Sequence, residues 1–167
     1  GDLFKVLRKG KASVVTDHID SFTEEGILLK SGKTLEADII ITATGLDIKL
    51  LGGIQLEKDG QAFDMTKKMI YKGSMLEDLP NAVMVFGYTN ASWTLKADMI
   101  SEYVCRLLKH MDKTGTRYCL PNNSDASVEK TPFLDMRSGY IQRALGRVPY
   151  QGSKAPWRLY QNYAMDY

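Results

Sequence analysis

The chain has 167 residues, of which 44% are hydrophobic and 25% are charged, so its composition is that of a globular protein. Its 22 basic and 20 acidic residues give a net charge of +2, a balance that argues against nucleic acid or an anionic membrane as a partner. No apolar run is long enough to cross a bilayer, and the first residues lack the pattern of a signal peptide. The two cysteines, Cys105 and Cys119, are too few for a disulfide framework or a metal site. We therefore expect a cytoplasmic protein without a metal.

The first forty residues contain several short segments separated by turns. Residues 2–8 have an apolar spacing that fits either a short helix or a strand. Three alternating or apolar segments follow, at 12–16, 18–23 and 26–30, and glycine-containing turns come after the second and the third. This pattern predicts a β-meander.

Residues 35–46 are the stretch around which the chain is organised. They contain three consecutive isoleucines and reach a glycine at Gly45. Such a run without alternation is typical of a strand buried on both faces in the middle of a sheet. Ligands of open α/β sheets bind at the carboxyl ends of the strands, and glycine lets the backbone approach them closely. We therefore expect a ligand near Ala43, Thr44 and Gly45.

The next segment predicts a hairpin and two further strands. Residues 54–57 and 61–63 flank Asp59-Gly60, a pair that favours the positive φ angles of a tight hairpin turn. Residues 69–72 predict another short strand. Residues 82–87 form a second apolar run that ends in glycine, and we interpret them as a second buried strand whose end faces the ligand.

A long amphipathic helix follows this second run. Asn90 and Ser92 are suitable N-caps, and Gly115 is a suitable stop. Lys96 is expected outside the apolar stripe of this helix, and Cys105 is expected beside it as a small core residue. The stripe has the i, i+3, i+4 spacing of one helical face and consists of Ile100, Tyr103, Val104, Leu107, Leu108 and Met111.

The pattern fades after residue 116. Residues 138–145 predict one short helix, and the tail from residue 156 onward is rich in aromatic residues. This tail is too apolar to remain free in solution, so we expect it to pack against the rest of the chain or against parts of a larger parent that this sequence does not contain.

Common catalytic and dinucleotide-binding motifs are absent from the sequence. None of its 14 glycines belongs to a G-x-G-x-x-G fingerprint, so we expect the chain to be a piece of a larger protein if it contributes to a dinucleotide site. His18 and His110 are isolated and fit structural or solvated positions better than metal sites. No G-x-S-x-G elbow supports a serine nucleophile.

Three stretches resemble one enzyme family. Asp38 with the Ala-Thr-Gly triplet at 43–45 resembles the motif that joins the two nucleotide-binding domains of flavin-containing and Baeyer-Villiger monooxygenases. Residues 81–98 are similar to the last flavin-contacting segment of the branch that includes ethionamide-activating and 4-hydroxyacetophenone monooxygenases. The tail, at 139–143 and 151–163, is similar to the C-terminal end of the same branch.

This resemblance implies a fold and a domain organisation. The fold class would be α/β, as the C-terminal portion of a flavoprotein with two dinucleotide-binding domains, containing a β-meander, buried parallel-type strands and one long amphipathic helix. Residues 1–46 would end the NADP-binding domain, residues 47–115 would be the C-terminal part of the FAD-binding domain, and residues 116–167 would be a C-terminal extension. The implied cofactor-binding residues are Thr44, Gly45, Gly87, Tyr88, Thr89, Asn90, Ala91, Ser92 and Trp93.

The resemblance also implies an activity for the intact parent. NADPH would reduce FAD, and a C4a-peroxyflavin would oxygenate a ketone or a soft heteroatom of a small-molecule substrate. The family's catalytic arginine and both glycine fingerprints lie outside this sequence, so we expect the isolated chain to be inactive and to bind FAD weakly. Two alternatives stay open, a non-enzymatic interaction domain and part of another flavoprotein such as a disulfide reductase. A disulfide reductase would normally carry a C-x-x-C pair, which this chain lacks.

Overall fold

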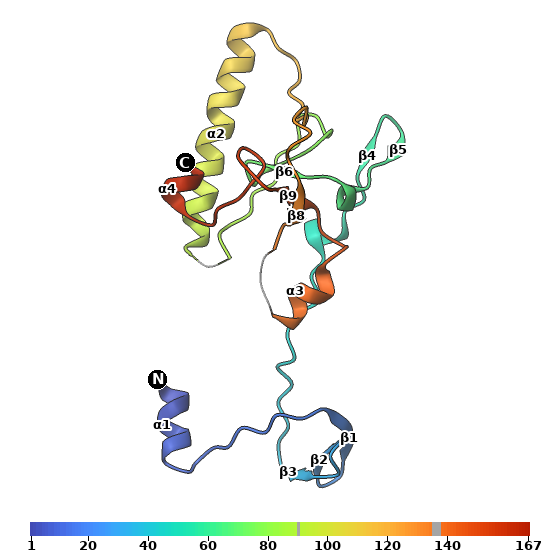
Figure 1. Ribbon diagram of the computed structural model, residues 1–167, viewed down its shortest axis with the longest axis vertical. Helices are drawn as coiled ribbons and strands as arrows, with labels where there is room; N and C mark the ends of the chain where they lie inside the picture. The colour runs from blue at the N-terminus through green and yellow to red at the C-terminus, as the bar shows by residue number, and fades with distance from the viewer. Residues whose placement is uncertain (90, 135–137) are drawn as a thin grey trace. The chain divides into compact units, whose positions relative to one another are not determined.

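The computed structural model describes residues 1–89, 91–134 and 138–167 (Figure 1). It divides into two compact units, residues 1–44 and residues 45–167. Both units combine helices with small antiparallel sheets, and one helix is much longer than the others described. The predicted mixture of helix and strand is therefore confirmed. The named strands in the described residues pair antiparallel, and the parallel pairing recorded there is an isolated bridge between Met69 and Tyr150.

The first unit contains the predicted meander. Its elements are α1 (Asp2–Arg8), β1 (Ile19–Thr23), β2 (Gly26–Leu29) and β3 (Thr34–Glu36). The three strands form one antiparallel sheet in the order β1-β2-β3. Residues 2–8, for which the sequence left helix and strand open, are helical, and residues 12–16 form no strand. The meander therefore begins one segment later than predicted, and its third strand lies at residues 34–36.

The predicted mid-sheet strand at residues 35–46 is wrong for this chain. Strand β3 includes only its first two residues, and residues 37–46 form no strand. The side chains of Ile39 and Ile41 are 81% and 85% exposed. A strand can be buried on both faces only where neighbouring strands and covering layers are present, and unit 1 has no strand that pairs with residues 37–44.

The second unit contains two short hairpins and one strand pair whose members are farther apart in the sequence. The Asp-Gly turn of the first hairpin is as predicted, since Asp59 and Gly60 have φ angles of +54° and +77°. The predicted strand at 69–72 is confirmed as β6, whereas β7, β8 and β9 were not predicted. The pairs are β4 (Glu57–Lys58) with β5 (Gln61–Ala62), β6 (Ile70–Tyr71) with β7 (Met75–Leu76), and β8 (Lys130–Pro132) with β9 (Tyr150–Gly152), and the 3-10 helices are η1 (Leu50–Gly53) and η2 (Met65–Lys67).

The predicted long helix is confirmed as α2 (Trp93–Thr114). It begins after Ser92 and ends at Gly115, whose φ of +66° is the left-handed conformation that stops a helix. Only Lys96, Met99 and Ile100 of this helix are buried. Lys96 was expected outside the apolar stripe, but it precedes Ile100 by four residues and so lies on the same face. The other apolar stripe residues are at least partly exposed, and Leu108 is 54% exposed.

Two further expectations about this region are wrong. Cys105 is exposed rather than a core residue. Residues 82–87 form no strand, although Ala82, Met84 and Phe86 pack against the core of the unit. Val85 is 52% exposed, because none of the sheets in the part of the chain that the structure describes includes this segment.

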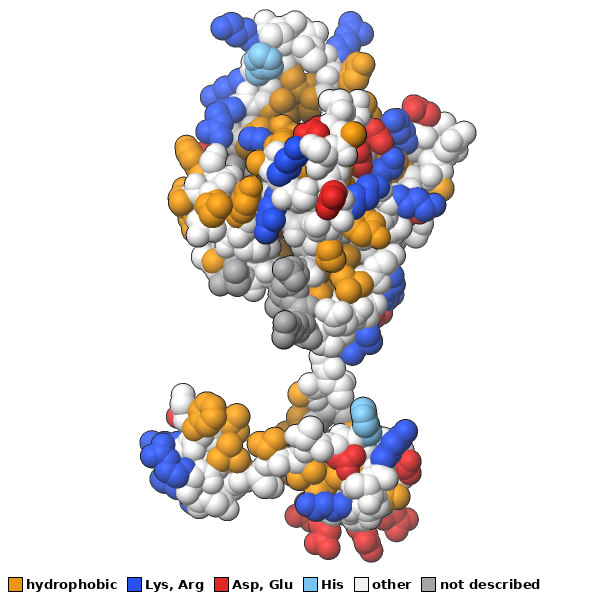
Figure 2. Space-filling model, viewed as in Figure 1, with side chains coloured by type: hydrophobic (Ala, Val, Ile, Leu, Met, Phe, Trp, Pro, Cys, Tyr) orange, Lys and Arg blue, Asp and Glu red, His pale blue; other side chains and the backbone are white. Residues whose placement is uncertain are grey.

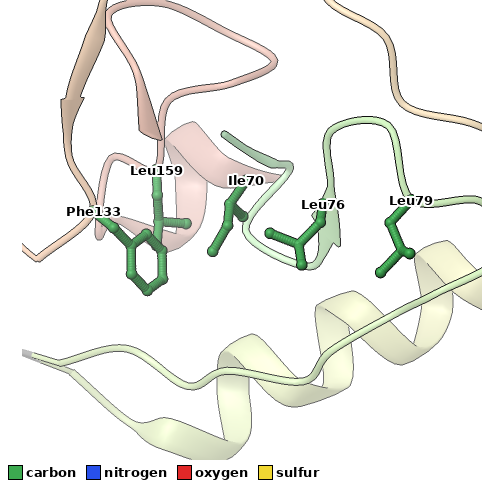
Figure 3. Packing of buried hydrophobic residues seen from close by; sticks show 5 residues of the cluster. All are labelled: Ile70, Leu76, Leu79, Phe133 and Leu159. Carbon is green, nitrogen blue, oxygen red and sulfur yellow. The ribbon is translucent and has the colours of Figure 1, made fainter. Parts of the chain in front are cut away.

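The core of the second unit gathers residues that are distant in sequence (Figure 3). Ile70 and Leu76 come from the β6-β7 hairpin and Leu79 from the turn that follows it, whereas Phe133 and Leu159 come from the last third of the chain. Each fully buried apolar side chain of this size contributes about 1.5–3 kcal/mol through burial. The core therefore fixes the C-terminal third of the chain to the hairpin that precedes α2.

The C-terminal region contains two short helices, α3 (Gly139–Ala144) and α4 (Tyr163–Asp166). Helix α3 confirms the helix predicted at residues 138–145. The aromatic tail packs on the unit as expected, with Trp157 only 4% exposed. Figure 2 shows hydrophobic side chains on the surface over α4, where Tyr163, Met165 and Tyr167 are exposed. Within the described residues, no helix has both the length and the apolar content that a membrane crossing requires.

Candidate functional site

The segment at residues 87–93, which leads into α2, contains most of the predicted cofactor-binding residues. Gly87 and Tyr88 are buried, whereas Thr89, Ala91 and Ser92 are exposed. Asn90, which was predicted both as a site residue and as an N-cap, lies outside the described residues. Ser92 is the N-cap of α2, but its hydroxyl lies 3.0 Å from the Thr94 hydroxyl and makes no side-chain cap. The exposed residues therefore lie around the N-terminus of a long helix, where backbone N–H groups favour an electron-rich ligand atom.

Gly87 is required by the side chain that begins α2. A Cβ atom built at Gly87 would lie 2.0 Å from Cδ2 of Trp93. The predicted close approach at Gly87 thus exists in this structure, but the group that uses it is the indole of Trp93. This indole is 56% exposed, so it is a surface side chain rather than a core residue.

Replacing Gly87 with alanine is expected to displace the Trp93 indole, at a cost of about 1–3 kcal/mol from the steric overlap. The fluorescence emission of Trp93, or the resonance of a fluorinated Trp93, should shift. Gly139→Ala is the matched control, because the nearest atom to its new Cβ is Nη1 of the flexible Arg143 at 3.4 Å. An unchanged Trp93 signal in Gly87→Ala would contradict the packing described here.

A buried charge pair lies beneath the start of α2. The Lys96 ammonium lies 3.6 Å from Oδ2 of Asp166, and the two side chains are 4% and 2% exposed. The same ammonium lies 5.4 Å from the centre of the Tyr88 ring, a cation–π distance. Burial lowers the pKa of Lys96, and the charge of Asp166 partly offsets this effect. Burial raises the pKa of Tyr88, and the Asp166 carboxylate adds to the rise.

No sequence motif indicates this pair as a feature of the site. Spacing alone would have placed Lys96 on the buried face, since it lies one turn before Ile100. Nothing in the sequence points to Asp166 as its partner, because the contact is made only when the tail folds back onto α2.

The other predicted site residues, Thr44 and Gly45, lie where the two units meet along the chain. Thr44 ends unit 1 and Gly45 begins unit 2, and both residues are exposed. Gly45 has a φ of +95°, and a Cβ atom at this position would lie 3.6 Å from Cβ of Tyr140 in α3. Gly45 therefore contacts α3, whereas Gly87 contacts the first residue of α2. The predicted arrangement, in which both glycines end adjacent strands, is not present in this structure.

The described residues offer little support for other chemistry. No group of three His, Cys, Asp or Glu side chains in residues 1–89, 91–134 and 138–167 could hold a metal ion. Cys105 and Cys119 are both free thiols.

Comparison with known proteins identifies close relatives. FAD-containing monooxygenase EthA of Mycolicibacterium smegmatis is 55% identical over 166 residues, which are 99% of this chain and 34% of that protein. The proteins of the same name from Mycobacterium tuberculosis and Mycobacterium bovis are each 53% identical over 166 residues, again 99% of this chain and 34% of theirs. No family model and no solved structure matches the chain.

The chain thus spans about a third of the length of the curated relatives that it matches. The predicted resemblance is confirmed. Nearly the whole of this chain is similar to a segment that makes up about one third of the length of each of these FAD-containing monooxygenases.

Proposed function

We propose that the chain is the C-terminal part of an FAD- and NADPH-dependent monooxygenase that oxygenates ketones or soft heteroatoms of a small-molecule substrate. The observation that carries this proposal is the identity of 55% over 166 residues to a protein named as an FAD-containing monooxygenase. Residues 1–46 would complete the NADP-binding domain, residues 47–115 the FAD-binding domain, and residues 116–167 would form a C-terminal extension.

Uncovered apolar surface supports a missing upstream part. Ile39 and Ile41 are exposed in an extended segment, and Val85 is half-exposed in the segment that leads to Gly87. Both segments have the composition of strands buried on two faces. In the proposed parent, strands from the upstream two thirds would pair with both, so that Gly45 and Gly87 end strands as their sequences predict.

The residues at the start of α2 fit a flavin. Thr89, Ala91 and Ser92 are exposed beside the N-terminus of a helix of 22 residues, and the adjacent Trp93 is 56% exposed. A helix N-terminus favours the electron-rich pyrimidine oxygen of a reduced flavin. Bound there, FAD would supply the oxygen-activating chemistry. The segment would orient its ring and exclude water, with Gly87 and Tyr88 as the buried base.

A chimeric enzyme tests the proposal. In this chimera, the present chain replaces the matching third of the M. smegmatis relative, to which it is 55% identical. We expect a yellow protein with the visible absorption of bound flavin, and we expect it to consume oxygen when NADPH is added. Absorption spectroscopy and an oxygen electrode measure both results.

Two controls make the result interpretable. The M. smegmatis relative without its matching third should bind no flavin, and the isolated chain of 167 residues should bind FAD only weakly. A chimera that is folded by circular dichroism but colourless and inert towards NADPH would overturn the proposal. That outcome would favour a non-enzymatic interaction domain.

A further inference from the structure

The C-terminal segment, residues 160–167, folds onto the start of α2 through polar contacts on two sides. The backbone N–H of Thr89 donates a hydrogen bond to Oε1 of Gln161, at 3.1 Å. Further along the same segment, Asp166 reaches Lys96 on the buried face of α2. The tail therefore contacts the chain on both sides of the start of α2, at Thr89 before the helix and at Lys96 within it.

The tail itself is arranged to present Asp166. The Asn162 side chain caps α4 by accepting hydrogen bonds from the backbone of Ala164 and Met165. One carboxylate oxygen of Asp166 accepts a hydrogen bond from the backbone N–H of Tyr160, at 2.8 Å, and the other faces the Lys96 ammonium. Both carboxylate oxygens thus have a defined direction, which fixes the loop between Tyr160 and α4.

The buried position of the pair makes it sensitive to the loss of either partner. Lys96 and Asp166 side chains are 4% and 2% exposed, so neither charge can turn to water while the tail stays in place. Removing one partner of such a pair leaves an uncompensated buried charge, whereas removing both leaves none. An uncompensated charge is relieved most simply when the tail detaches.

We propose that residues 160–167 form a C-terminal latch, in which Lys96 and Asp166 act as positioning residues that hold Tyr88 and Thr89 in the conformation that receives the flavin. The latch acts through the Tyr88 ring, against which Lys96 lies, and through the Thr89 amide, which Gln161 holds. The role of the latch towards flavin rests on the proposed function. Its existence does not, because every contact is within this chain.

The first test uses the chain of 167 residues, labelled with fluorotryptophan. Its two tryptophans, Trp93 next to Gly87 and the buried Trp157, give two fluorine resonances that a Trp93→Phe variant assigns. In Lys96→Met we expect the Trp93 resonance to shift or broaden while the Trp157 resonance keeps its position. Chymotrypsin should then cleave after Tyr160 and Tyr163 about tenfold faster, because the tail opens locally. Asp166→Asn should behave in the same way.

Two further variants separate the latch from a general loss of stability. Glu102→Gln removes a charge from the exposed face of α2, where the Glu102 side chain is 62% exposed. This variant should leave both resonances and the cleavage rate unchanged. The double variant Lys96→Met with Asp166→Asn should be cleaved more slowly than either single variant, since no unpaired charge remains. Equal cleavage and an unmoved Trp93 resonance in Lys96→Met would overturn the latch. A shift of both the Trp93 and the Trp157 resonances to unfolded positions would also overturn the latch, because the Lys96–Asp166 pair would then stabilise the whole unit rather than the tail.

The second test places the same variants in the chimeric enzyme. Lys96→Met should weaken flavin binding about tenfold relative to Glu102→Gln, as measured by the flavin released on dilution. Flavin affinity within twofold of the control would overturn the positioning role even if the tail opens in the isolated chain. If the chimera without variants binds no flavin, the proposed function fails, and the first test alone decides whether the latch exists.

Discussion

Leu76→Ala is expected to lower the free energy of unfolding of residues 45–167 by about 2–5 kcal/mol, the usual cost of deleting most of a buried leucine side chain. Leu76 is 0% exposed and belongs to the cluster that joins the β6-β7 hairpin to Phe133 and Leu159. The cavity would lie where segments distant in sequence meet, and the structure cannot close it by moving one strand alone. A natural domain has only about 5–15 kcal/mol of net stability, so this loss is large.

Urea denaturation followed by tryptophan fluorescence measures the effect, because Trp157 is buried in the same unit. Leu108→Ala is the matched control, since this leucine of α2 is 54% exposed and its truncation should change stability by no more than about 0.5 kcal/mol. Equal midpoints for the two variants would show that the cluster does not hold the unit together.

Gly26→Ala is expected to abolish the three-stranded sheet of residues 1–44. A Cβ atom at Gly26 would lie 2.0 Å from the carbonyl oxygen of Leu35, which is backbone of the neighbouring strand β3 and cannot rotate away. Gly26 also has a φ of +147°, a backbone conformation that is strained for any residue other than glycine. In unit 1 only Gly26 and Leu29 are buried, so little apolar packing is available to offset a cost of about 2–5 kcal/mol.

Amide hydrogen exchange measures this effect, since the N–H groups of β2 and β3 should lose their protection. Gly32→Ala isolates the conformational strain, because Gly32 has a φ of +84° but no atom within 4 Å of the added Cβ. That control should cost about 1 kcal/mol and leave the sheet in place. A Gly26→Ala protein with protected strands would mean that β3 can move away without loss of pairing.

Local signals in the sequence predicted the elements that depend on local physics. Helix α2 follows from its apolar spacing and from Gly115, and the β4-β5 turn follows from the positive φ preference of Asp59-Gly60. The meander follows from short apolar segments between turns. Each of these elements makes its hydrogen bonds with residues close in sequence, so the pattern contains most of the information.

Elements that depend on distant partners were missed or wrong. Strands β8 and β9 pair across an intervening segment that contains helix α3, and neither has the alternation that would predict a strand. The apolar runs at 35–46 and 82–87 were interpreted as buried strands. An apolar run indicates only that the segment would be a stable strand if other strands and helices covered both of its faces. Whether neighbouring strands exist depends on other segments, and none of the described residues pairs with either run.

The candidate site was predicted only in part for the same reason. Gly87 was predicted to be a point of close approach. The group that approaches it is the side chain of Trp93, and this contact depends on the local backbone conformation, which the sequence pattern does not specify. The pair formed by Lys96 and Asp166 joins α2 to the last turn of the chain, and neither residue carries a sequence signal for the other. The assignment of Thr44, Gly45 and residues 87–93 to a cofactor stays a prediction.

The extended isoleucine segment affects how the chain behaves on its own. Ile39 and Ile41 are 81% and 85% exposed, and no proline or charge lies between Asp38 and Asp47. Residues 39–45 therefore offer backbone outside any strand pair, and β-branched side chains, to another copy of the chain. Segments of this kind are prone to add to one another as strands and to aggregate. A charged residue in place of Ile41 would act as a gatekeeper, and the isolated chain should be handled dilute.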